Sequence, residues 1–115
     1  MFEHLKTLCE LNGTSGREDK VREYIIEQIK DKAGYSVDKL GNIIAFKKGN
    51  AVPKNKIMLD AHMDEVGLIV TSVQPDGTLT FTEVGGIDPS VVIGRQVTVN
   101  GLYGVVGAKA VHNLR

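Results

Sequence analysis

Several features that would assign the chain to a large class of proteins are missing. Only one cysteine, Cys9, is present among 115 residues, so no internal disulfide can form and a cytoplasmic location is favoured. The formal net charge is zero, from 14 basic and 14 acidic residues. This balance gives no electrostatic reason to expect a nucleic acid or a membrane as a partner. No apolar run is long enough to span a bilayer, and residues 1–4 do not resemble the start of a secretory signal peptide.

Tryptophan is absent too, and aromatic residues make up only 5% of the chain. The rest of the composition, with 42% hydrophobic and 24% charged residues, is that of an ordinary globular protein. The length suits one domain or parts of two. Most of the 13 glycines lie behind a helix-rich front part, so the sequence predicts an α/β organisation followed by a β-rich element.

Two amphipathic helices are predicted at the front of the chain. Apolar residues at helical spacing indicate the first helix over residues 2–11. Residues 15–18, Ser-Gly-Arg-Glu, match a capping box. In that motif the Ser15 hydroxyl accepts from the N–H of Glu18, and the Glu18 carboxylate accepts from the N–H of Ser15. The second helix is therefore expected to begin there and to run to about residue 32, with Gly34 as its stop.

Strand-like segments follow, each bounded by turn residues. Residues 35–38 and 42–47 predict a hairpin around Gly41-Asn42. A second hairpin is predicted from two further strands joined by Asp76-Gly77, a frequent turn dipeptide. Several short strands at such spacing favour a small barrel or sandwich. The later strands are expected at residues 66–73, 78–84, 91–93, 96–99 and 102–106, with strand character continuing to Lys109.

The stretch from residue 56 to residue 67 carries the densest functional signal. Residues 57–59 are an apolar run that predicts a short buried strand, and three carboxylates and one imidazole follow it within six residues. Because strand side chains alternate between faces, Asp60, His62 and Asp64 are expected to point to one side. Burying such groups is costly without a partner, and a divalent metal is the usual partner. From spacing alone, a hydrogen-bonded histidine without a metal is the alternative.

The same stretch resembles the signature of a known enzyme family. Residues 58–67, Met-Leu-Asp-Ala-His-Met-Asp-Glu-Val-Gly, are similar to the signature of the dinuclear metallo-aminopeptidases of the tetrahedral (TET) type. That family includes glutamyl and deblocking aminopeptidases, and some of its members carry a cellulase or endoglucanase label. Further likenesses cover the rest of the chain, at residues 13–18, 38–42, 84–89, 93–97 and 104–109.

The resemblance implies a fold class and a division into two domains. Residues 1–66 would be the N-terminal part of a zinc-peptidase catalytic domain, an α/β domain with two helices and a mixed sheet. Residues 67–115 would be the start of an inserted small PDZ-like β-barrel domain that builds dimer contacts in the family. The family's other metal ligands and its acid–base glutamate follow that insertion. The chain is therefore expected to be the N-terminal portion of a peptidase and to be inactive alone.

The resemblance also implies an activity and a site. The implied reaction is the hydrolysis of N-terminal residues from peptides by a water that two divalent metal ions, zinc or cobalt, activate. In that scheme His62 binds one metal through a ring nitrogen, and the Asp64 carboxylate orients the imidazole and raises its basicity. Asp60 and Glu65 match no ligand position of the family. The implied partners are peptide substrates and further copies of the chain, since the family forms dimers that assemble into larger particles.

Two other functions stay open from the sequence. The residues after about 66 could be a non-catalytic, β-rich interaction and assembly module with the front half as an appendage. Glycoside hydrolysis is a distant third hypothesis that rests on labels of family members. It needs two carboxylates beside a sugar-binding cleft, and the absence of tryptophan leaves little aromatic surface for stacking.

His112 is an isolated histidine near the end of the sequence. We expect it to be structural or solvated and not a metal ligand.

Overall fold

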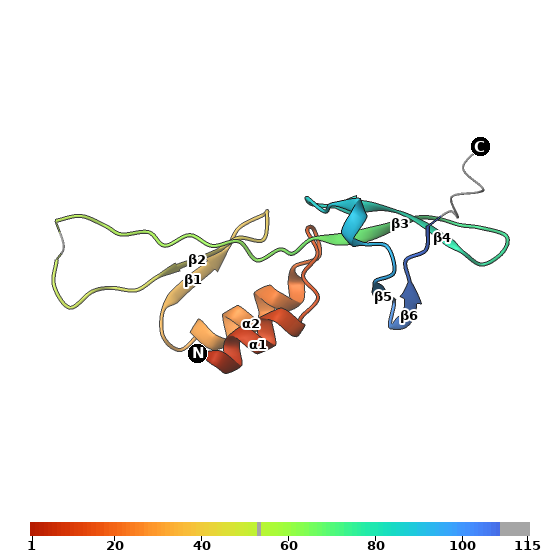
Figure 1. Ribbon diagram of the computed structural model, residues 1–115. Coiled ribbons are helices and arrows are strands. Elements are labelled where there is room, and N and C mark those ends of the chain that lie inside the picture. Colours follow the sequence, from red (N-terminus) through yellow and green to blue (C-terminus); the bar gives the residue numbers. More distant parts are fainter. Residues whose placement is uncertain (53, 109–115) are drawn as a thin grey trace. The chain divides into compact units, whose positions relative to one another are not determined.

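The computed structural model describes residues 1–52 and 54–108 (Figure 1). The chain divides into two compact units, one comprising Met1–Val66 and the other beginning at Gly67. The elements of the first unit are α1 (Phe2–Glu10), α2 (Asp19–Ile29), β1 (Gly34–Val37) and β2 (Ile43–Phe46). Those of the second are β3 (Gly67–Val73), β4 (Leu79–Val84), the 3₁₀ turn η1 (Pro89–Val91), β5 (Gln96–Val99) and β6 (Leu102–Val105).

The two predicted helices are present, but the second one begins differently from the prediction. Helix α1 agrees with the expected residues 2–11 within one residue. The prediction of a capping box was wrong, because Glu18 itself is the N-cap residue of α2 and no side chain caps the helix. The Glu18 carboxylate instead accepts from the backbone N–H of Gly16 at 2.6 Å. Gly16 has a φ of +82° and the Arg17 N–H bonds to the Thr14 carbonyl at 2.7 Å, so a turn occupies these residues and the helix starts after it.

Helix α2 is also shorter than predicted, since it ends at Ile29 and not at about residue 32. The N–H groups of Lys32 and Ala33 both bond to the Ile29 carbonyl, at 2.8 and 3.1 Å. This shared acceptor closes the last turn tightly, as is common at helix ends. The one buried residue of α2 is Val21, which is 6% exposed.

The first hairpin confirms the two predicted strands around residue 40. Strand β1 pairs antiparallel with β2 in the register Gly34↔Phe46 to Val37↔Ile43. Its loop, residues 38–42, is longer than the expected residues 39–41, and it is organised by one carboxylate. Asp38 accepts from the backbone N–H groups of Leu40 and Asn42 and from the Asn42 side-chain amide, each at 2.9 Å. These bonds, led by the one from the Asn42 side chain, hold the pKa of Asp38 below its ordinary value of 3.8.

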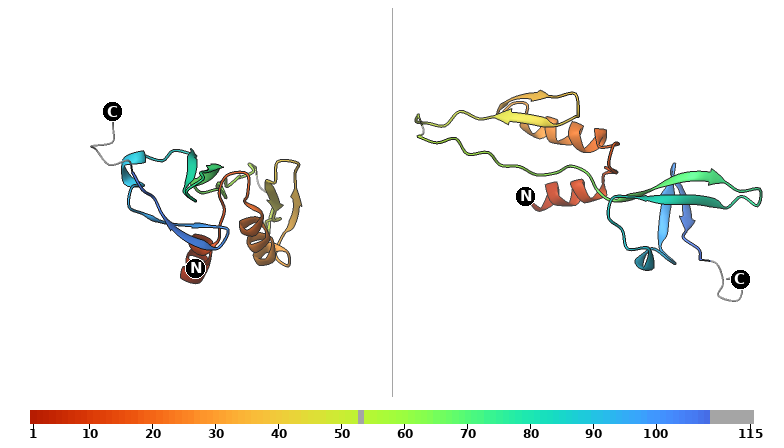
Figure 2. Two further views of the ribbon diagram at one scale, coloured as in Figure 1. Left: turned by 90° about the vertical axis from the view of Figure 1, so that its right-hand side faces the viewer. Right: turned by 90° about the horizontal axis from the view of Figure 1, so that it is seen from above.

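The segment that follows corrects the prediction of a buried strand over residues 57–59. Residues 54–64 have no regular secondary structure, and Figure 2 shows this yellow-green part as an extended trace. Ile57, Met58 and Leu59 are 88%, 87% and 94% exposed. A strand needs a neighbour that accepts its backbone hydrogen bonds, and no backbone bond joins these three residues to any other residue within the described ranges.

The second unit contains two hairpins. The one joined by Asp76-Gly77 was predicted, whereas for the other only its two strands were predicted. Strand β3 pairs antiparallel with β4, with a register shift between Val70 and Ser72, and Gly77 in the connecting turn has a φ of +84°. Strand β5 pairs antiparallel with β6 through Asn100-Gly101, whose φ values of 48° and 82° are those of a type I′ turn. Among residues 67–108, the buried residue is Val106, whose backbone bonds to Gly94 and Arg95.

One predicted strand in this unit is wrong. Residues 89–91 form the turn η1 where a strand was expected from residue 91 to residue 93. The Asp88 carboxylate accepts from the N–H of Ser90 at 2.9 Å, and Pro89 occupies the first turn. A capping carboxylate followed by proline starts a helical turn, and this local signal overrides the β-branched residues that suggested a strand. Strand β6 ends at Val105, while Lys109 and His112 lie outside the described residues.

The described residues thus form a small α/β structure with two helices and three two-stranded antiparallel sheets. Neither the expected mixed sheet nor a closed barrel is present among residues 1–52 and 54–108. The one parallel pairing that the structure describes is an isolated bridge between Thr14 and Glu65. None of the described helices has the length and apolar character needed to cross a membrane.

Candidate functional site

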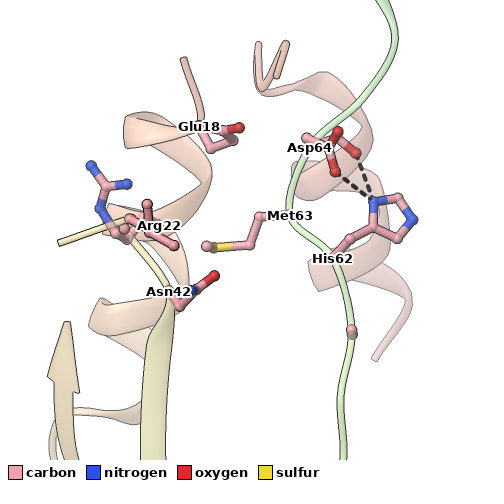
Figure 3. Close-up of a pocket in the computed structure, with 9 residues that line it drawn as sticks. Glu18, Arg22, Asn42, His62, Met63 and Asp64 are labelled. Carbon is pink, nitrogen blue, oxygen red and sulfur yellow. Dashed lines mark hydrogen bonds and ion pairs between the residues drawn. The ribbon is translucent and has the colours of Figure 1, made fainter. Parts of the chain in front are cut away.

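The side chains of His62 and Asp64 contact each other in the first unit (Figure 3). The Nδ1 atom of His62 lies 3.0 Å from Oδ1 of Asp64 and 2.9 Å from the Asp64 backbone carbonyl oxygen. The His62 side chain is 84% exposed and that of Asp64 is 44% exposed. The pair therefore faces solvent and not an apolar interior.

These contacts assign the proton of the imidazole. A backbone carbonyl can only accept a hydrogen bond, and so can an ionised carboxylate. Both partners of His62 Nδ1 are such oxygens, so Nδ1 carries the hydrogen and donates it. In the neutral ring the lone pair is then on Nε2. A neutral imidazole held by a carboxylate at one nitrogen, with its other nitrogen free to coordinate, is the usual form of a histidine that binds a metal.

A shallow hollow of about 160 Å³ lies beside this pair within the first unit. Figure 3 shows Met63 pointing toward Arg22 and Asn42, while His62 points away from them. The Arg22 guanidinium is paired with the Asp19 carboxylate one turn away on α2, so its charge is neutralised locally. The hollow is lined by Glu18, Arg22, Leu40, Gly41, Asn42 and residues 61–64.

The backbone behind the pair is attached to the loop between α1 and α2. The N–H of Glu65 donates to the Gly13 carbonyl at 2.8 Å, and the Glu65 carboxylate accepts from the Gly13 N–H at 3.1 Å. This contact was not predicted, because no local pattern marks two residues 52 positions apart as partners. Glycine at position 13 was the one available signal, since it tolerates close approach of another backbone.

The described residues do not supply a complete metal centre. No group of three or more histidine, cysteine, aspartate or glutamate side chains is gathered closely enough in residues 1–52 and 54–108 to hold an ion. His62 offers one suitable donor atom, Asp60 is exposed, and Glu65 is engaged with Gly13. The described residues therefore offer one imidazole nitrogen, Nε2 of His62, beside the carboxylate that contacts the other ring nitrogen.

Comparison with known proteins assigns this site to a family of enzymes. The M42 glutamyl aminopeptidase family matches residues 41–115, which include the His62–Asp64 pair and the whole of the second unit. The chain belongs to this family, and the resemblance to TET-type aminopeptidases is confirmed.

Individual relatives agree with the family assignment. The lysyl aminopeptidase of Pyrococcus furiosus is 38% identical over 96% of this chain and 33% of its own length. The TET1 peptidase of Pyrococcus horikoshii, described as able to assemble into a tetrahedron or a large octahedral shell, has a TM-score of 0.77. It is 40% identical over 99% of this chain and 36% of its own. A structure described as an endoglucanase of Thermotoga maritima has a TM-score of 0.81 and is 42% identical over 90% of this chain and 33% of its own.

The chain thus spans about a third of the length of the relatives that it matches. The fold, a small α/β arrangement of helices and antiparallel strands, is common to the chain and to these structures.

Proposed function

We propose that this chain is part of a metal-dependent aminopeptidase that hydrolyses N-terminal residues from peptides. The observation that carries the proposal is the His62–Asp64 contact, which lies within the stretch that matches the family. The aminopeptidases among the relatives support the same activity.

The residues of the chain have separate tasks in this proposal. His62 binds one metal through Nε2, because Nδ1 is occupied by Asp64. Asp64 fixes the ring orientation and makes Nε2 a better donor. When bound, a pair of zinc or cobalt ions supplies an acidified water and polarises the scissile carbonyl. We assign no other metal ligand and no general base to residues 1–52 and 54–108.

The two units have separate tasks as well. We propose that residues 1–66 are the first part of the catalytic domain and that residues 67–115 begin an inserted PDZ-like β-barrel domain that makes dimer contacts. Support comes from the division of the chain at Val66 and from the assembly described for the P. horikoshii peptidase. The enzyme is expected to act on peptides in the cytoplasm as a homo-oligomer.

The test compares the 115-residue chain with a longer protein in which it replaces the matching third of a full-length relative, each supplied with zinc or cobalt. Leucyl or glutamyl chromogenic substrates report aminopeptidase activity. The longer protein is expected to turn over, and the short chain is expected to be inactive because it lacks donors. Asp64→Asn in the longer protein is expected to lower activity or metal affinity by roughly 10- to 100-fold, whereas Asp60→Asn, a matched change at an exposed carboxylate, has little effect. Equal effects of the two changes would contradict the assigned role of Asp64.

A non-catalytic assembly module is the second candidate function. It is favoured by the exposed apolar side chains of β6, namely Leu102, Tyr103 and Val105, because exposed apolar patches often mark contact surfaces. Absence of peptidase activity in the longer protein, together with self-association of the short chain in sedimentation experiments, would favour this candidate. Cellulose as a control substrate tests the endoglucanase label carried by the T. maritima structure.

A further inference from the structure

The segment that carries His62 and Asp64 lacks the support that a sheet would provide. Residues 54–64 form no strand, and no backbone hydrogen bond connects residues 57–62 to another described residue. A catalytic constellation must nevertheless be held within about 0.5 Å of its productive geometry. A contact that fixes this backbone next to the pair would serve that purpose.

Glu65 makes the required contact, directly after Asp64. Its backbone N–H donates to the carbonyl oxygen of Gly13 at 2.8 Å. Its side-chain carboxylate accepts from the N–H of the same glycine at 3.1 Å. The two bonds satisfy both polar backbone groups of Gly13, which is buried. A buried N–H without an acceptor would cost about 1–3 kcal/mol, so the Glu65 carboxylate is a specific partner for a group that needs one.

The surroundings of Gly13 leave no room for a side chain at this position. A Cβ at this position would lie 2.7 Å from Cγ2 of Val21 and 3.3 Å from the Met63 carbonyl oxygen. Val21 is the buried apolar residue of α2. The backbone of residues 63–65 therefore lies directly against the loop after α1, which in turn rests on α2.

We infer that Glu65 is a positioning residue of the proposed metal site, and this inference rests on the proposed function. Through Gly13 it fastens the backbone directly after the pair, so that His62 and Asp64 keep one orientation relative to the rest of the first unit. The task requires an oxygen that accepts a hydrogen bond and does not require a negative charge. Glutamine can therefore replace Glu65, whereas alanine cannot.

The experiment compares Glu65→Ala, Glu65→Gln and Asp60→Ala in the longer protein that carries the chain. Asp60→Ala is the matched control, because it removes an exposed carboxylate from the same segment. Hydrogen exchange measured by mass spectrometry follows peptides that contain the amides of Gly13 and Glu65, with a peptide from α2 as a folding control. Steady-state kinetics with an aminoacyl chromogenic substrate and cobalt give kcat and KM separately.

Glu65→Ala is expected to raise exchange in both peptides while α2 stays protected. It is also expected to lower kcat by on the order of 10- to 100-fold with little change in KM, because a small misplacement of a catalytic group has that effect. Glu65→Gln is expected to keep both exchange protection and kcat within about threefold, and Asp60→Ala to match the unsubstituted protein. The proposal is overturned if Glu65→Gln lowers kcat as much as Glu65→Ala does while the amides of Gly13 and Glu65 stay protected from exchange. The negative charge of Glu65, and not its hydrogen bond, would then determine kcat. Unchanged exchange in Glu65→Ala would overturn it as well.

Failure of the proposed function would look different. The unsubstituted protein would then have no aminopeptidase activity with zinc or cobalt, whereas the exchange data would still show whether Glu65 holds the segment at Gly13. The two measurements therefore separate the contact from the chemistry that it is proposed to serve.

Discussion

Replacing Gly13 with alanine is expected to destabilise the first unit by about 1–3 kcal/mol, the usual cost of adding a methyl group to a filled space. The added Cβ would lie 2.7 Å from Val21 Cγ2, although two carbons pack best at about 3.5–4.0 Å. Val21 must therefore move by roughly 1 Å, and a β-branched side chain has few rotamers in a helix with which to do so. The Met63 carbonyl oxygen would lie 3.3 Å from the same Cβ, so the added methyl group meets a second tight contact. Urea unfolding followed by far-UV circular dichroism measures the change in free energy.

Gly34→Ala is the matched control for this substitution. No atom lies within 4 Å of a Cβ built at Gly34, and its φ is not positive, so alanine is expected to be neutral or to stabilise by less than about 1 kcal/mol. A second test repeats Gly13→Ala in a Val21→Ala background, where the obstructing methyl group is gone. The penalty is expected to shrink by about 1 kcal/mol or more. A Gly13→Ala protein as stable as the Gly34→Ala control, or an identical penalty in both backgrounds, would refute the steric argument.

Two smaller predictions concern the loops of the hairpins. The Asn42 side chain holds the pKa of Asp38 below 3.8, so the loop between β1 and β2 gains stability above that pH and loses it as the pH falls through the lowered value. Amide exchange in β1 and β2 should therefore increase below about pH 4, and Asp38→Ala should remove this dependence. Asn100 has a φ of 48°, which costs most other residues about 1–2 kcal/mol. Asn100→Ala should weaken the β5–β6 pairing, as read from cross-strand nuclear Overhauser effects, and Asn100→Gly should preserve it.

Elements whose signals are local could be predicted from the sequence. The hairpin turn at Asp76-Gly77 depends on a glycine that tolerates positive φ, so its position was predicted correctly. Helix α1 follows from its own apolar spacing. The capping box failed because Gly16 adopts a left-handed conformation, which lets a turn compete with the first turn of the helix.

Features that depend on distant neighbours could not be predicted. Residues 57–59 have the composition of a buried strand, but burial requires a partner strand, and in the described structure these side chains are exposed. The pairing of His62 with Asp64 could be predicted because two residues suffice to bring the groups together. The contact of Glu65 with Gly13 could not, because it depends on how the loop after α1 folds back against the segment.

The separation of Gly13 and Glu65 in the chain has a consequence for the order in which the first unit forms. Their contact spans 52 positions, whereas the β1–β2 hairpin begins from the near neighbours Val37 and Ile43. Closing the larger loop costs about 2 kcal/mol more chain entropy than closing the hairpin. Helices and hairpins can therefore form early, while the ring and carboxylate reach their final places only in a late step of folding, after the polypeptide has been synthesised through Glu65.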